Sequence, residues 1–552
     1  MKTEPPASAR LPSLDRRTLF KGSALAIGMA AVPASASAAT APGFAYGVAS
    51  GEPGADSVLL WTRYGAGRDA VLNWELARDI AFIDIVVGGR VTATSARDFC
   101  VKPVATGLAP DSWYYYRFVA ANGDVSCIGR TRTLPVGRVD TWRMAVFSCS
   151  NIGFGYFNAY AHAAEQNAFD LIVHTGDYFY EYGSATYPSA EVKVAGRDAL
   201  PLTEAVSLAE YRLRHASYRA DPDLRRLTQL YPMIMGWDDH ESANDSWAGG
   251  AENHDPQTEG PWDARKAAAM RSYREWLPVS DTPYAAYDIG DLARLIRLET
   301  RLMNRDEPPD IGAVLQGKGS RAEALAALAA FRDGAYRDPA RTMLGMEQET
   351  WVADQLRGST AAGQKWQVLV QQVIMGELAA APDLVGDIPA GVPPYIRARL
   401  MAAAGAAAVG LPLNMDAWDG YPAARSRLLA SAQAADANLV VLAGDSHNAW
   451  AFALENDGAP AGVEFAGQSV TSPRFEGTLG WVDPAELAKG VVGANAELRW
   501  ADTARRGYMA VELTPDTATC DYRFTPDVRV RSAAVSDSHR VGVRHGSNTL
   551  EG

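Results

Sequence analysis

Residues 439–447 read Leu-Val-Val-Leu-Ala-Gly-Asp-Ser-His, five apolar residues followed by a glycine, a carboxylate and an imidazole. A short, continuous apolar run that stops at glycine is typical of a strand buried on both faces of a sheet. Open α/β sheets gather their ligand sites at the carboxyl ends of such strands. The stretch therefore predicts a buried strand that delivers Asp445 and His447 to a functional edge of the sheet.

Three further apolar segments end in the same manner. Each one stops at potential metal ligands, and they span Trp142–Cys149, Leu171–Asp177 and Met233–Glu241. A single Gly-Asp pair after a strand is a weak signal, because aspartate often caps a turn or a helix. Four such endings in one chain predict a shared pocket. Their alternation with helical segments after Pro135 indicates an α/β or α+β catalytic unit.

The segment Gly176-Asp-Tyr-Phe-Tyr180 supplies hard oxygen ligands. A carboxylate can bridge two cations about 3.5–4 Å apart, which is the spacing that two-metal hydrolysis uses, and Asp177 suits that bridge. The phenolate oxygen of Tyr180 would favour a trivalent cation such as iron over zinc. Tyr178 and Tyr182 are rivals for this role, and the alternative for Tyr180 is an aromatic side chain that packs a loop.

The other strand ends carry mixed ligands. An isolated cysteine is usually a small buried apolar side chain, but Cys149 ends its strand, where a bound metal would stabilise its thiolate. Residues 238–241, Asp-Asp-His-Glu, are either part of the site or a capped helix start with solvated charges. Asp445 and His447 would divide between two metals, or else be a turn aspartate and a surface histidine.

Short β-rich segments separated by turns fill the chain from about residue 44 to residue 135. This pattern predicts a small β-sandwich of the fibronectin-III type. The stretch Leu108–Tyr114 is typical of a tyrosine corner, in which the Tyr114 hydroxyl would bond the backbone. Cys100 and Cys127 lie on expected strands, and the sequence leaves their pairing in a disulfide open.

The N-terminus resembles a twin-arginine export signal. Arg16 and Arg17 precede an apolar run of about eleven residues, well below the ~20 needed to cross a bilayer. We expect recognition by the twin-arginine translocation machinery, cleavage near Ala38 and no transmembrane anchor afterwards. The mature protein would be periplasmic or secreted, and this route carries folded proteins that take up metal before export.

Composition narrows the function classes. The 552 residues are 47% hydrophobic and 21% charged, as in a globular protein. A net charge of −13 without a basic cluster speaks against nucleic-acid binding. Four cysteines with no Cys-x-x-Cys pair speak against a disulfide framework or a zinc ribbon. Residues 532–552 predict a loose tail, and residues 305–342 and 379–411 resemble insertions that fold over a site.

Five motifs, in order along the chain, resemble the alkaline phosphatase D (PhoD-like) family of metallophosphoesterases. They are Phe147–Asn151 with Gly155–Phe157, Gly176–Tyr180, Trp237–Glu241 with Asn244, Asp416–Tyr421 and Gly444–His447. The resemblance covers roughly residues 43–530. It implies a four-layer sandwich of two mixed sheets between helices. The expected boundaries are a signal peptide at 1–38, a β-sandwich domain at 43–137, a catalytic domain at 138–531 and a tail at 532–552.

The resemblance also implies an iron–calcium centre. It assigns Fe3+ to Cys149, Tyr180 and His447, makes Asp177 the bridge, and gives Asp239 and Asp445 to Ca2+. His240 would be the catalytic residue over the substrate, Asn244 or Glu241 would add to a further site, and the number of Ca2+ ions stays open. Glu299 stands where the family pattern has aspartate, which bears on the local support of the site.

The reaction implied is hydrolysis of phosphate esters, small or polymeric, by a metal-bound hydroxide, with His240 assisting the leaving group. No Gly-x-Ser-x-Gly elbow accompanies the ligand clusters, which argues against a covalent serine hydrolase. Phosphomonoesters are the expected substrates, with phosphodiesters beside them. The alternatives are a phosphodiesterase or phospholipase D-type hydrolase with the same metals, and a non-catalytic protein that binds a cell-envelope polymer.

Overall fold

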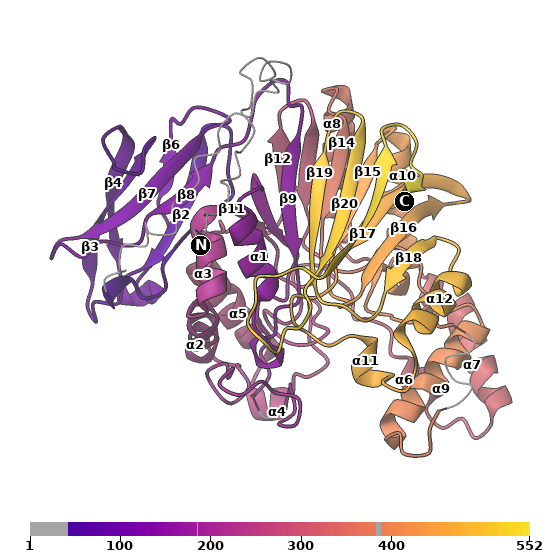
Figure 1. Ribbon diagram of the computed structural model, residues 1–552. Helices are drawn as coiled ribbons and strands as arrows, with labels where there is room; N and C mark the ends of the chain where they lie inside the picture. The colour runs from indigo at the N-terminus through magenta and orange to yellow at the C-terminus, as the bar shows by residue number, and fades with distance from the viewer. Residues whose placement is uncertain (1–41, 185, 382–387) are drawn as a thin grey trace, which may run out of the picture. The chain divides into compact units, whose positions relative to one another are not determined.

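The computed structural model describes residues 42–184, 186–381 and 388–552 (Figure 1). These described residues form one compact unit. The predicted export signal and the cleavage point near Ala38 lie outside the described residues. Within the described ranges, no helix combines the length and apolar character that a membrane span requires.

The first large sheet is built around three of the ligand-bearing runs. Strands β9 (Trp142–Phe147), β10 (Leu171–His174) and β11 (Pro232–Met235) are parallel neighbours, and almost all of their residues are buried. Antiparallel strands extend the sheet on the β9 side: β19 (Gly507–Leu513), β20 (Thr517–Phe524), β21 (Asp537–Arg544) and β22 (Leu550–Glu551). The carboxyl ends of β9, β10 and β11 therefore lie at one edge, as the sequence predicts.

The second sheet carries the fourth run, β15 (Leu439–Ala443), at its centre. Its order is β12 (Ala285–Ile289), β13 (Ala293–Arg297), β14 (Trp366–Val370), β15, β17 (Ala459–Ala466), β16 (Ala449–Asn456) and β18 (Leu498–Asp502). Strands β13, β14, β15 and β17 run parallel. Val146 and Val173 of the first sheet share one core with Val368 and Leu442 of the second, so the sheets pack face to face.

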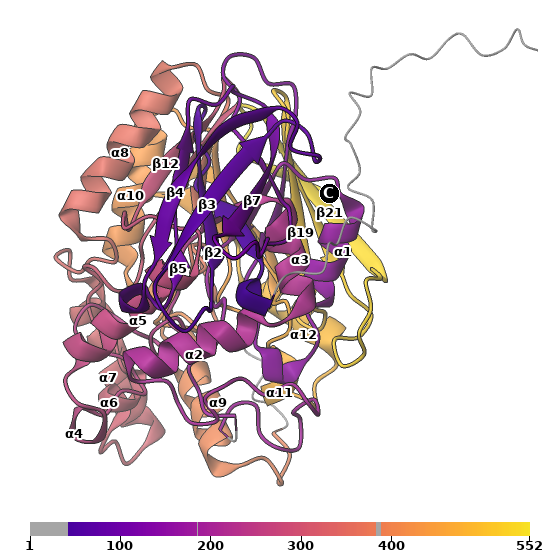
Figure 2. The ribbon, with the colours of Figure 1, turned by 90° about the vertical axis from the view of Figure 1, so that its left-hand side faces the viewer.

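Helices cover the outer faces of both sheets (Figures 1 and 2). The helices by the first sheet are α1 (Asn158–Gln166), α2 (Leu208–Arg219), α3 (Pro222–Leu230), α4 (Pro256–Glu259) and α5 (Trp262–Trp276). Those by the second are α8 (Gly345–Ala361), α10 (Pro422–Ala434) and α12 (Pro484–Ala494), and the short helix α11 (Phe475–Thr478) lies below the sheets in Figure 1. The predicted four-layer order of helices, sheet, sheet and helices is confirmed.

The predicted N-terminal β-sandwich is also present and faces the viewer in Figure 2. One of its sheets is β4 (Ile85–Ala93), β3 (Ala70–Ala77), β7 (Trp113–Ala120) and β8 (Gly129–Arg132). The other is β1 (Val48–Gly51) and β2 (Ser57–Arg63) with β5 (Cys100–Val101) and β6 (Val104–Thr106). Because β1 also pairs with β11, this second sheet continues into the catalytic one. The domain boundaries stay predictions.

The sequence predicted one detail of this sandwich, the tyrosine corner, and left a second, the disulfide, open. The Tyr114 hydroxyl accepts the Ala109 N–H at 2.9 Å, which confirms the tyrosine corner. Cys100 is buried and forms no disulfide, so the pairing with Cys127 that the sequence left open is absent here.

The loose tail predicted for residues 532–552 is wrong for Asp537–Arg544 and Leu550–Glu551, which form strands β21 and β22. Strand β21 pairs with β20 from Thr517–Arg544 to Phe524–Asp537. Val541 and Val543 of β21 are buried in the core between the sheets. Strand β21, next to the short edge strand β22, buries only alternate side chains, so its sequence stays polar enough to resemble a tail.

The two predicted insertions form one helical lobe at the lower right of Figure 1. Its helices are α6 (Ile311–Leu315), α7 (Arg321–Asp333) and α9 (Pro394–Ala408). They share a small apolar core that includes Leu328, Ala406 and Met415. Met415 directly precedes Asp416, so this lobe adjoins the candidate site.

Candidate metal centre

The loops after β9, β10, β11 and β15 turn sharply and bring their polar residues together. Four of the predicted ligands in these loops have left-handed backbone angles, with φ of 60° at Cys149, 54° at Asp177, 58° at Asp445 and 64° at His447. This conformation is disfavoured for residues with a Cβ, and it clusters at functional sites. The surrounding structure holds all four in place.

The glycines of the two Gly-Asp motifs allow these loops to approach closely. A Cβ at Gly176, whose φ is +123°, would lie 2.4 Å from the Cβ of Asp238. A Cβ at Gly444 would lie 2.6 Å from Ser148 and from Thr175. Glycine is therefore needed for contact between loops as well as for the turn.

One half of the centre combines sulfur, nitrogen and oxygen donors. Ligand atoms of Cys149, Asp177 and His447 lie within 4.8 Å of one another. The Tyr180 hydroxyl lies 2.9 Å from Asp177 Oδ2 and 2.9 Å from His447 Nε2. His447 donates from Nδ1 to the Pro473 carbonyl at 2.6 Å, which leaves Nε2 free to bind a cation. The structure thus brings together all four residues predicted for Fe3+.

The other half is built from carboxylates. Ligand atoms of Asp238, Asp239 and Asp445 form one group within 4.8 Å, and those of Asp177, Asp239 and His240 form another. Burial raises the pKa of Asp177 and of Asp445 well above the usual carboxyl value, and neighbouring carboxylates add to the rise. Asp177 Oδ1, Asp238 Oδ2 and Asp239 Oδ1 are buried without a hydrogen-bond partner. Buried carboxylates are normally paired or bound to metal, so this group fits a cation.

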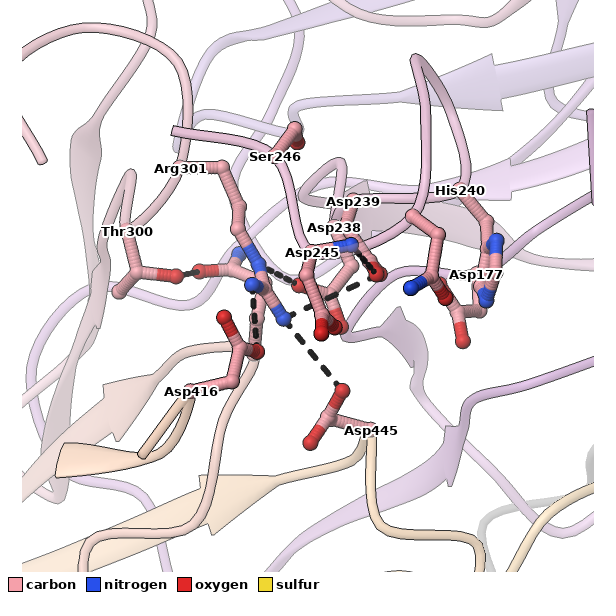
Figure 3. A network of polar contacts seen from close by, with 12 residues as sticks. Asp177, Asp238, Asp239, His240, Asp245, Ser246, Thr300, Arg301, Asp416 and Asp445 are labelled. Atoms are coloured by element: carbon pink, nitrogen blue, oxygen red, sulfur yellow. Dashed lines mark hydrogen bonds and ion pairs between the residues drawn. The ribbon is translucent and has the colours of Figure 1, made fainter. Parts of the chain in front are cut away.

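Arg301 lies among these carboxylates and is fully buried (Figure 3). Its guanidinium bonds Asp238, donates to Asp416 at 2.6 Å and to Asp445 at 3.3 Å, and lies 3.8 Å from Asp239. Arg305 holds the other oxygen of Asp416. Asp416 belongs to one of the five sequence motifs but had no predicted role, and in the structure Arg301 and Asp416 together support the predicted ligands.

Glu299 explains how Arg301 reaches the centre. Its carboxylate accepts the Trp237 indole N–H at 2.7 Å and the backbone N–H groups of Arg301, Leu302 and Met303. It therefore fixes the loop that carries Arg301. The longer side chain at this departure from the family pattern supports the site and is not a ligand.

His240 is held by a glutamate that sequence reasoning missed. Its Nδ1 lies 2.8 Å from Glu181 Oε2, while Glu181 Oε1 accepts from the Asn244 N–H at 2.8 Å and the Asn253 amide at 3.0 Å. Since Nδ1 donates to Glu181, Nε2 faces Asp177 and Asp239 (Figure 3). Burial opposes protonation of the imidazole, but these carboxylates together raise the pKa of His240 well above its usual value. The position of Glu181, one residue after Tyr180, was the available signal.

The two residues predicted for an additional metal site have other contacts. Both Glu241 oxygens accept backbone N–H groups, from Asp177 at 3.1 Å, Tyr178 at 2.5 Å and Asp238 at 2.7 Å. Glu241 therefore holds the loops after β10 and β11 together, and a role for Glu241 at a cation stays a prediction. The Asn244 side chain donates to Glu252, and a role for Asn244 at a cation stays a prediction.

Asp245 was not predicted, yet it belongs beside the carboxylate group. Its backbone N–H donates to Asp239 Oδ2 at 2.7 Å. Figure 3 shows its carboxylate next to Asp238 and Asp239. Burial, together with Asp416 and Asp239, raises the pKa of Asp245 well above the usual carboxyl value. The left-handed turn at Asp245, with φ of 48°, sets this direction and leaves no sequence signal.

Two facing mixed sheets, with thiol, phenol, imidazole and carboxylate donors at their carboxyl ends, define a metallophosphoesterase-type hydrolase. Comparisons with known proteins agree. The family models for the PhoD-like phosphatase and for its N-terminal domain match residues 144–522 and 29–135. Alkaline phosphatase D of Bacillus subtilis (strain 168) is 33% identical over 519 residues, 89% of this chain and 79% of the relative.

A solved structure of PhoD superposes with a TM-score of 0.74 at 29% identity and covers 92% of this chain and 91% of its own. The chain therefore belongs to the PhoD-like phosphatase family, as the five motifs indicate. It is a phosphoric ester hydrolase.

Proposed function

We propose that this phosphoric ester hydrolase is exported and uses one Fe3+ with Ca2+ to hydrolyse phosphomonoesters and, beside them, phosphodiesters. The observation that carries the proposal is the division of donors within one buried centre. Cys149, Tyr180 and His447 offer sulfur, phenol and imidazole on one side, while Asp239 and Asp445 offer only carboxylate oxygens on the other. Asp177 lies in the groups on both sides.

The donor types favour these two cations. A phenolate and a thiolate are anions that stabilise a trivalent ion, and oxygen-only ligands suit the hard, flexible coordination of Ca2+. When bound, the cations would neutralise phosphoryl oxygens and lower the pKa of an attacking water. The three buried carboxylate oxygens that have no hydrogen-bond partner support such binding, because a bound cation would supply the partner that they lack.

Side chains of the protein supply the proton transfer and hold the ligands in position. His240 presents Nε2 to the space beside Asp177 and Asp239, where it can give a proton to the departing alkoxide. Glu181 accepts from Nδ1 and so fixes the imidazole in one orientation and tautomer. Arg301 offsets the repulsion between Asp238 and Asp445 by donating hydrogen bonds to both.

The test uses purified protein loaded with iron and calcium, assayed on a chromogenic phosphomonoester and on the matching diester. We expect turnover of both, faster on the monoester, with iron found by elemental analysis and a visible charge-transfer colour. Zinc alone in active protein would contradict the iron assignment. Diester turnover well above monoester turnover would favour a phosphodiesterase, and no turnover of either would favour a non-catalytic binding protein.

A further inference from the structure

The loop that follows β17 closes over the half of the centre that contains Cys149, Tyr180 and His447. Residues 469–472 of this loop, Ser-Val-Thr-Ser, are completely buried. The Val470 N–H donates to the Ser148 carbonyl at 3.0 Å, and the Thr471 hydroxyl donates to the Asn151 carbonyl at 2.7 Å. The loop is thus fixed along the end of β9, although no motif in the sequence marks it.

Each predicted iron ligand in this half is contacted by the loop. The Pro473 carbonyl accepts from His447 Nδ1 at 2.6 Å. The Cys149 carbonyl accepts the Thr471 N–H at 3.4 Å and the Ser472 N–H at 3.3 Å. The Ser472 hydroxyl lies 2.7 Å from the Tyr180 hydroxyl oxygen.

The Ser472 hydroxyl has one proton and two acceptors within reach. Besides Tyr180, the Cys149 carbonyl lies at 3.1 Å, but that carbonyl already accepts two backbone N–H groups. If Tyr180 is an anionic ligand, its oxygen is the stronger acceptor, because hydrogen bonds to charged oxygens are shorter and about twice as strong as neutral ones. The proton then belongs to the Ser472–Tyr180 bond.

We propose that Ser472 is a positioning residue that donates a hydrogen bond to the ligand oxygen of Tyr180 and so sets the donor strength of this phenolate toward Fe3+. The inference rests on the proposed function, since it requires Tyr180 to bind iron. A hydrogen bond withdraws electron density from the phenolate oxygen. This raises the energy of phenolate-to-iron charge transfer and makes Fe3+ easier to reduce.

The experiment compares absorption spectra and reduction potentials of iron-loaded wild type and Ser472→Ala. Loss of the hydrogen bond should move the charge-transfer band to longer wavelength and the potential to a more negative value, with iron content unchanged. Thr471→Val is the matched control, because it removes a buried hydroxyl from the next residue without touching Tyr180. Ser472→Thr keeps a hydroxyl and should keep the wild-type band.

The outcomes separate the inference from the function on which it rests. A wild-type protein that is active without an iron band overturns both. A wild-type band that Ser472→Ala leaves in place, or that Thr471→Val moves equally, overturns the role of Ser472 alone. If Ser472→Ala does not hold iron, resonance Raman spectra of the wild type in H2O and D2O decide. A tyrosinate C–O frequency that changes supports the bond, and one that is identical in both overturns it.

Discussion

At the scale of single residues, His240 is predicted to act in catalysis and not in metal binding. Glu181 engages Nδ1 at 2.8 Å, so the imidazole is oriented without a cation. We expect His240→Ala to lower turnover by roughly 10²–10⁴-fold, the range of general acid–base assistance, with metal content near wild type. Alkyl esters should lose more than nitrophenyl esters, because a nitrophenolate leaves without a proton.

Glu181→Gln serves as the companion variant, since it weakens the orientation of His240 but leaves the imidazole present. Its turnover should fall less than that of His240→Ala, with the same dependence on the leaving group. Equal losses on both ester types would restrict His240 to an electrostatic role, and loss of metal in His240→Ala would make it a ligand.

The carboxylate of Asp177 lies between the two halves of the centre and is predicted to bind a cation in each. It belongs to the group with Cys149 and His447 and to the group with Asp239 and His240. Asp177→Asn keeps the shape of the side chain and removes the anion, so we expect loss of both metals and of activity. Elemental analysis with an activity assay checks this. Full metal content with normal turnover would show that Asp177 is a turn residue only.

At the scale of elements, contact between the loops after β10 and β11 makes the site. Gly176 and Asp238 approach so closely that a Cβ at Gly176 would meet that of Asp238 at 2.4 Å. We expect Gly176→Ala to separate these loops, lower the melting temperature and weaken metal binding by at least tenfold. Two effects lower the stability of the variant. One is the clash with Asp238, and the other is the left-handed backbone conformation, which costs a residue with a Cβ about 1–2 kcal/mol.

Gly123→Ala is the control for the backbone part alone. Gly123 also has a positive φ, +91°, but a Cβ there meets nothing within 4 Å. Its substitution should cost about 1–2 kcal/mol of stability and leave metal affinity unchanged. Similar metal losses in both variants, measured by calcium titration of iron-loaded protein, would argue against the loop-contact explanation.

At the scale of the whole molecule, the prediction concerns export. Arg16 and Arg17 precede a short apolar run, and this arrangement resembles a twin-arginine signal. Changing both residues to lysine should leave the precursor in the cytoplasm, where cell fractionation and immunoblotting would find it at full length. Mature protein outside the inner membrane in this double variant would show that another route exports it.

Much of the fold followed from local patterns in the chain. The apolar runs at β9, β10, β11 and β15 predicted buried strands, because a strand covered on both faces needs continuous apolar residues. The tyrosine corner at Tyr114 predicted the N-terminal sandwich. Strand β21 could not be predicted this way, since a strand with only two buried valines has too little hydrophobic pattern to distinguish it from a polar tail.

For the site, the sequence by itself determined the ligand types, because a glycine and a carboxylate at a strand end are local features of the chain. Only the tertiary structure decided which neighbours hold them. Glu181, Arg301 and Ser472 act through hydrogen bonds to residues 59, 144 and 292 positions away in the chain. The packing of the two sheets and their loops brings these partners together. The spacing of residues along the sequence does not indicate which of them will meet.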